Sequence, residues 1–332
     1  MWRKMCAVLI LTSFFAPSLA ASEEYDVGAM SSEKAFETGR LLRAQFKNAE
    51  SRVYLKLAAE NENPEALFLY AMELSNYKTT IRTPPEARKY LLKAAELGNR
   101  RAMYQLFTSA KWLRDMDIAY WRNQYYSSLI MLGRDNPSQA MYELARFHKG
   151  SDSELFSHYL DVAAGFDHPL ALMDKAKSIG DDEGLFQFDR GGDHADKLYL
   201  AAAKTLYIPA IRNYISLLED KGRYKEAYEW RLTALEQGDI TSLAVVSKIL
   251  LGHSSTYSFV PQDRVRAKAY IDLYLLFAGD ERMTSLRTAL ELNEENISVA
   301  MNNKERKQSE EIYLKYKTSL IFYNHDKFWD TH

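Results

Sequence analysis

The sequence predicts an all-α protein, an α/α solenoid of about seven helix-hairpin repeats with helical caps. Two observations support this prediction. The 332 residues include only 14 Gly and 8 Pro, the two residue types that most often interrupt helices. In addition, a short alanine-containing pattern returns every ~36 residues through most of the chain, and a period of that size is typical of stacked helical pairs.

The composition indicates a folded chain with a sizeable core. Hydrophobic residues make up 47% of the sequence and charged residues 27%, which excludes disordered and collagen-like classes. The 43 Lys and Arg residues nearly balance the 45 Asp and Glu residues, so the formal charge is -2. Because no basic excess draws the chain toward phosphates, we expect no nucleic-acid partner.

Residues 1–20 are organised like a secretory signal peptide. Arg3 and Lys4 give a basic start, an apolar run follows over 5–16, and small residues precede a cleavage position after Ala20. The alternative is an uncleaved membrane anchor, but the run is shorter than the roughly 20 residues that span a bilayer. We therefore expect a cleaved signal and no membrane span in the mature chain.

The cysteine content points to one compartment. The only cysteine, Cys6, lies within the predicted signal, so the mature chain would have no disulfide and no thiolate metal site. An exported chain of this size without cysteine fits a Gram-negative periplasm better than a eukaryotic extracellular space, where disulfides are common. We expect a periplasmic protein.

The repeats are predicted to fill residues 50–290, after a linker and capping helix over 21–49. Their pattern is Ala-Ala-Glu, a turn, and a further Ala seven residues after the second Ala. We call that last position the anchor. The anchors stand at positions 66, 102, 140, 171, 210, 242 and 283.

Each unit is predicted to be a pair of helices. Pro84 and Pro85 open one helix, where a missing amide donor has no cost, and Gly98 ends it in a left-handed turn. A small residue at the anchor lets the next helix approach closely. Because one hairpin cannot bury its own apolar face, we expect the hairpins to stack into a solenoid with a concave surface; a plain helical bundle is the alternative.

These residues resemble the Sel-one-like repeat family, which is related to the tetratricopeptide repeats. The family signature is Ala-Ala-Glu-x-Gly-Asn-x-x-Ala. Residues 85–106 match it closely and 54–74 match it well, whereas the copies over 155–290 are degenerate. The resemblance implies an α-solenoid that binds another protein, and periplasmic members of the family are immunity proteins.

The last predicted part, residues 291–332, is a capping helix and a tail. The final helix is expected to begin near Ser298 and to carry an apolar stripe through Ile312 to Tyr323. Phe328-Trp329 is expected to dock on that helix; an exposed contact is the alternative.

The sequence predicts no catalytic residue, no cofactor and no metal site. None of the seven histidines has the spacing of a helical metal ligand, and His168 is expected to cap a helix. The acidic stretch near Asp189 fails as a Ca²⁺ loop, because Gly191, His194 and Leu200 stand where an oxygen ligand, a glycine and a glutamate are required.

Four aromatic residues are candidate partner-binding positions. Tyr120 and Tyr126 lie off the apolar stripe of their predicted helix, and Tyr257 and Phe259 stand in a long predicted loop over 252–262. Aromatic residues on an open face are typical anchors for a protein partner. The alternative is that each packs against the next repeat.

The sequence therefore predicts a non-catalytic, periplasmic protein-binding scaffold. The resemblance favours an immunity protein that neutralises a periplasm-delivered toxin, such as a type VI secretion phospholipase effector. An envelope regulator or assembly adaptor is the alternative. A second alternative, an envelope-polymer hydrolase, would need scattered carboxylates to pair in space.

Overall fold

The structure is a computed structural model that describes residues 30–77, 83–182, 191–281 and 283–325. The predicted signal peptide and the Phe328-Trp329 tail lie outside the described residues. Within the described ranges the chain forms sixteen α-helices and no strand. The prediction of an all-α fold is confirmed.

The helices follow one another along the chain with short connections. Their bounds are α1 (Ser32–Ala44), α2 (Asn48–Glu60), α3 (Pro64–Tyr77), α4 (Pro85–Glu96), α5 (Arg100–Ser109), α6 (Asp115–Asp135), α7 (Pro137–His148), α8 (Ser153–Gly165), α9 (Pro169–Asp182), α10 (Gly191–Lys204), α11 (Ile208–Asp220), α12 (Tyr224–Glu236), α13 (Ile240–Leu250), α14 (Arg264–Phe277), α15 (Thr284–Ala300) and α16 (Asn303–Ser319). The capping helix expected within residues 21–49 ends at Ala44, because Phe46 adopts a left-handed backbone conformation, and a second helix begins at Asn48.

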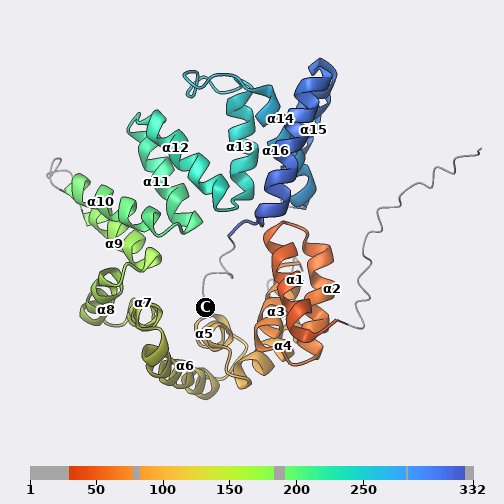
Figure 1. Ribbon diagram of the computed structural model, residues 1–332. Coiled ribbons are helices and arrows are strands. Elements are labelled where there is room, and N and C mark those ends of the chain that lie inside the picture. Colours follow the sequence, from red (N-terminus) through yellow and green to blue (C-terminus); the bar gives the residue numbers. More distant parts are fainter. Residues whose placement is uncertain (1–29, 78–82, 183–190, 282, 326–332) are drawn as a thin grey trace, which may run out of the picture.

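The helices pack as a solenoid. From α1 to α14, each helix packs mainly against the helices before and after it in the chain, and α16 packs on α14. Figure 1 shows these elements following one another around a ring, with α5 and α7 nearer its middle than α6 and α8. The second helices of these hairpins therefore form the inner side of this part of the ring.

The anchor alanines are buried in the packed helices. No solvent reaches the side chains of five of them, Ala66, Ala102, Ala140, Ala171 and Ala210. A larger side chain at such a position would have to displace the neighbouring helix, at about 1–3 kcal/mol. The repeat pattern thus acts through packing, as the sequence predicted.

The two ends of the solenoid meet and close it. The amide of Gly279 donates to the carbonyl oxygen of Gln45 at 2.6 Å, and the amide of Asn324 donates to that of Ala44 at 2.8 Å. Phe46 is buried in the hydrophobic cluster of the C-terminal helices. The molecule is therefore a closed ring (Figure 1), a contact between the two ends that the predicted solenoid with helical caps did not include.

The segment from Leu320 to His325, which we call the strap, joins three parts of the ring. Its residue Tyr323 donates its amide to the carbonyl of Gly238 at 2.9 Å and accepts from the amide of Ile240 at 3.1 Å. Arg212 of α11 binds Asp239, the residue that caps α13, and also binds Asn324 of the strap. The final helix therefore ends at Ser319, before the Tyr323 expected within it, because the strap pairs as extended backbone.

Candidate functional site

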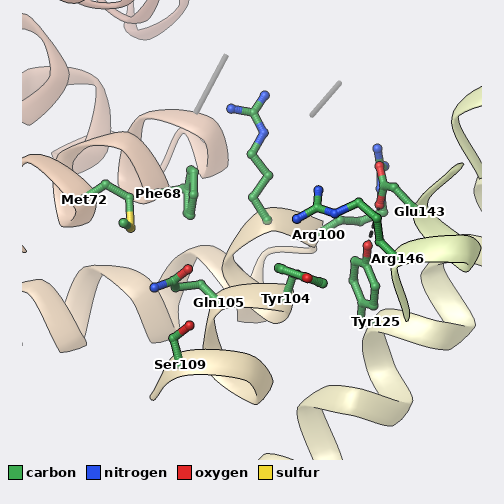
Figure 2. A pocket seen from close by; sticks show the side chains of 10 residues that line it. Phe68, Met72, Arg100, Tyr104, Gln105, Ser109, Tyr125, Glu143 and Arg146 are labelled. Carbon is green, nitrogen blue, oxygen red and sulfur yellow. Dashed lines mark hydrogen bonds and ion pairs between the residues drawn. The ribbon is translucent and has the colours of Figure 1, made fainter. Parts of the chain in front are cut away.

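A pocket of about 400 Å³ lies where three successive hairpins meet. We call it the arginine pocket. Figure 2 shows Phe68 and Met72 on one side and Tyr104, Arg146 and Glu143 on the other. The lining residues come from α3, α5, α6 and α7: Phe68, Met72, Arg100, Arg101, Tyr104, Gln105, Ser109, Tyr125, Glu143 and Arg146.

The repeat geometry explains why these side chains converge. Phe68 and Tyr104 each stand two residues after an anchor alanine, and Gln105 and Glu143 each stand three residues after one. Equivalent positions of stacked hairpins point the same way, because each hairpin repeats the orientation of the one before it. The pocket is thus built from corresponding positions of neighbouring repeats.

Two arginines of the pocket lack a full set of partners. Arg146 lies over the ring of Tyr104, with its guanidinium carbon 4.6 Å from the ring centre, and forms no ion pair with any described residue. The Nε atom of Arg100 is buried without a hydrogen-bond acceptor and lies 3.6 Å from the nearer oxygen of Glu143. Arg100 is thus held by a long ion pair to Glu143 and Arg146 by the ring and hydroxyl of Tyr104, and neither guanidinium forms a close hydrogen bond to a carboxylate of the described residues.

The carboxylate of Glu143 is committed to other groups. It accepts hydrogen bonds from the hydroxyl of Tyr125 and from the amide nitrogen of Gln139, both at 2.9 Å. Burial, with the nearby carboxylate as a second cause, raises the pKa of Tyr125 well above its usual value, so the phenol stays protonated and donates. Glu143 therefore fixes α6 against α7 and leaves Arg146 without a carboxylate.

This network continues to His168, at the start of α9. Gln139 donates to Glu143, so its carbonyl oxygen accepts from Nε2 of His168 at 2.9 Å, and Nδ1 accepts the amide of Ala171 at 3.4 Å. Burial lowers the pKa of His168 to about 4. His168 is thus a neutral helix cap, as the sequence predicted.

The four aromatic residues predicted as partner-binding positions differ in their exposure to solvent and in their place in the ring. Tyr120 and Tyr126 are 54% and 37% exposed on α6. Tyr120 lies opposite the buried stripe of Trp121, Tyr125 and Leu129, so it points away from α5 and α7. It belongs to the outer side of the ring, where no pocket wall surrounds it.

The other two candidates lie in the loop between α13 and α14, as predicted. Phe259 is 42% exposed, but Tyr257 is only 5% exposed. The hydroxyl of Tyr257 binds Glu219 and accepts from Arg231. The expectation of an accessible Tyr257 is therefore corrected: its polar end holds the loop to α11 and α12.

The residues of the arginine pocket were missed by the sequence analysis. Their signal was available in principle, because the pocket-facing residues Tyr104, Gln105 and Arg146 stand two, three and six residues after an anchor alanine. Reading these offsets across neighbouring repeats would have grouped them. The criterion of lying off an apolar stripe instead selected Tyr120, which points away from α5 and α7, and Tyr126, whose ring contacts Phe147 of α7.

The described residues contain no group of three or more His, Cys, Asp or Glu side chains placed to hold a metal ion. In the same part of the chain, every helix is either too short or too polar to pass through a bilayer.

The fold and the pocket define the class of protein as a helical repeat protein. The chain matches no protein-family model and no curated protein. Among solved structures it is similar to a Sel1 repeat protein from Oxalobacter formigenes, with 18% identity, coverage of 86% of this chain and 88% of that one, and a TM-score of 0.39.

Two other solved structures are similar to the chain over different lengths. One is a protective antigen of uropathogenic Escherichia coli strains that displays an SLR fold, at 16% identity and a TM-score of 0.41; the match covers 90% of this chain but only 62% of the antigen. The other is an immunity protein from Pseudomonas aeruginosa, at 20% identity and a TM-score of 0.43, covering 66% of this chain and 83% of that one.

Proposed function

We propose that this chain is a non-catalytic scaffold that binds a protein partner in the periplasm, and that its role is that of an immunity protein. In this role it would neutralise a toxin delivered into the periplasm, such as a type VI secretion phospholipase effector. The immunity role comes from the repeat resemblance of the sequence. The support for a protein partner comes from this chain's own surface.

The observation that carries the proposal is the position of the arginine pocket. Residues from three successive hairpins line it, and it lies among helices on the inner side of the ring. A surface shared by several repeats is where solenoids present a continuous binding face. Arg and Tyr, which dominate the wall of this pocket, are enriched among the residues that carry most of the energy of protein interfaces.

Neutralisation of a toxin tests the proposal directly. An effector encoded beside this gene would be directed to the periplasm of cells with and without the chain, and growth would be followed. We expect growth to recover with the chain and the two proteins to elute together as a stable complex. An effector that stays fully active beside an excess of the folded chain would contradict the proposal.

Two tryptophan substitutions locate the binding surface. Gln105→Trp places a bulky side chain in the arginine pocket, whereas Asn123→Trp places the same side chain on the exposed face of α6. We expect the first substitution to weaken the complex at least tenfold and the second to leave it unchanged. Equal effects would place the partner elsewhere on the ring.

A further inference from the structure

The arginine pocket is chemically divided. On the side of Tyr104 stand the guanidinium groups of Arg100 and Arg146, and across the pocket stand Phe68 and Met72 (Figure 2). The guanidinium of Arg101 lies 5.7 Å from the centre of the Phe68 ring. Among the ten lining residues, three are arginines and only Glu143 is acidic. The wall therefore offers positive charge and apolar surface within one small cavity.

The positive side is arranged to receive an anion. Arg146 is held by its contact with Tyr104, so its planar guanidinium has a fixed orientation. An oriented guanidinium can give a carboxylate two parallel hydrogen bonds, which are about twice as strong as bonds between neutral groups. Arg100 adds a buried Nε donor that has no hydrogen-bond acceptor among the described residues, although its guanidinium forms a long ion pair with Glu143 at 3.6 Å.

The apolar side of the pocket determines which chemical group can lie beside the anion in a ligand. Thioether and phenyl side chains make favourable contacts with aromatic rings, in addition to the burial of apolar area. A cavity of about 400 Å³ lies near the small end of the range for ligand pockets, which suits a few side chains better than a large cofactor. The two sides together suit an acidic group next to an aromatic one.

We propose that the arginine pocket binds a carboxylate carried beside an aromatic side chain, which is the chemistry of an acidic-aromatic peptide segment. Arg146 takes the carboxylate, and Phe68 and Met72 contact the aromatic ring. The inference rests on the proposed function, because it names what the binding surface recognises in its partner.

We assign this segment to the protein partner of the proposed function. The sequence of this chain also contains Phe328-Trp329-Asp330, after the last described residue, His325, and the experiment below distinguishes that occupant from a partner.

The test uses two synthetic peptides with blocked ends, Phe-Trp-Asp and its neutral counterpart Phe-Trp-Asn. Their binding to the full mature chain is measured by calorimetry. We expect the acidic peptide to bind about tenfold or more tightly than the neutral one, because only the acid gains charge-assisted hydrogen bonds. Equal binding of the two peptides would overturn the inference.

Variants of Arg146 test whether the preference for the acidic peptide comes from this pocket or from a general attraction between the peptide and the charged surface. Arg146→Gln should abolish the preference for the acid, and Arg146→Lys should keep part of it, because lysine retains charge without the planar fork. The matched control is Arg122→Gln, since Arg122 also lies over an aromatic ring, that of Phe147 at 5.0 Å, but outside the pocket. An unchanged preference in a folded Arg146→Gln protein contradicts the inference.

A chain that ends at His325 identifies the source. If the shortened chain binds the acidic peptide several-fold more tightly than the full chain, residues 326–332 are the natural occupant. If the two chains bind it equally, the site is open to a partner. Loss of the peptide preference alongside an intact toxin complex rejects only this inference, whereas peptide binding without any toxin complex rejects only the scaffold role.

Discussion

The turns between repeats and the seam that closes the ring are held together in opposite ways. In a turn, the amide after the left-handed residue bonds back to the first alanine of the pattern, as Asn99 does to Ala94 at 2.9 Å. In the seam, Gly279 and Gln45 come together from opposite ends of the described chain. The turns are local structures, whereas the seam depends on the fit of every repeat between its two sides.

The turns keep their shape even where their sequence has degenerated. Gly98 and Gly238 have φ angles of 90° and 86°, and the equivalent residues Glu62, Asp167 and Leu206 remain left-handed at 57°, 55° and 63°. The penalty for a side chain there is about 1–2 kcal/mol. Packing of the buried alanines on each side therefore outweighs the local preference of the chain.

The largest expected effect is at the seam. Phe46→Ala removes a buried ring from the C-terminal cluster and should lower the free energy of unfolding by about 3–5 kcal/mol. Urea unfolding gives this value, and small-angle scattering should show a larger radius if the ring opens.

The control for Phe46 is an aromatic residue away from the seam. Phe166→Ala, at an exposed position after α8, should change stability by less than about 0.5 kcal/mol. A Phe46→Ala protein as stable as the Phe166→Ala protein would mean that the ends meet without stabilising the fold.

Acidification should lower the free energy of unfolding by almost as much, through His168 in the turn before α9. Burial holds the pKa of His168 at about 4 against 6.5 in a model peptide. Since the folded value is the lower one, the unfolded chain takes the proton first; stability is complete above pH 6.5 and falls as the pH drops toward 4, by about 3 kcal/mol. Urea unfolding between pH 7 and 4 measures the loss.

A variant isolates the contribution of this histidine. His168→Asn keeps a helix-capping oxygen but has no group that titrates in this range. It should therefore lose about 3 kcal/mol less than the parent protein over the same pH interval. Identical pH profiles for the two proteins would assign the acid sensitivity to other groups.

The same contrast explains which features could be predicted from the sequence. The turn at Gly98 and the burial of Ala102 follow from residues within one repeat, so pattern and propensity were enough. The bond between Asn324 and Ala44 depends on the summed rotation of all the repeats, and no single repeat contains that information.

The arginine pocket is intermediate in how far it could be predicted from the sequence. Arg146 and Tyr104 occupy corresponding regions of adjacent repeats, but their pairing becomes visible only when the repeats are stacked. Tyr120 was chosen because it leaves the apolar stripe of its own helix, a criterion that cannot tell the inner side of a ring from the outer side.

A smaller effect at the seam is expected from Gly279→Ala. A Cβ atom at this position would overlap the backbone of Phe46 and Lys47, so the two ends would have to move apart, at about 1–3 kcal/mol. The comparison is Gly133→Ala within α6, where the nearest atom would lie at an ordinary 3.7 Å and helix propensity favours alanine by up to about 1 kcal/mol. Thermal unfolding should move in opposite directions for the two variants.

The smallest effect should be a gain in stability at a degenerate turn. Leu206 has a left-handed backbone conformation and an exposed side chain, so Leu206→Gly removes the backbone strain without removing a buried contact. Glycine also gains more conformational freedom in the unfolded chain, which offsets part of this benefit, so the net gain in stability should be up to about 1 kcal/mol. An added side chain at a regular turn, Gly98→Ala, should destabilise by about 1–2 kcal/mol, since nothing lies within 4 Å of a Cβ atom there and only the backbone conformation is penalised. If Leu206→Gly is destabilising in urea unfolding, the turns are held by their side chains, and their contrast with the seam disappears.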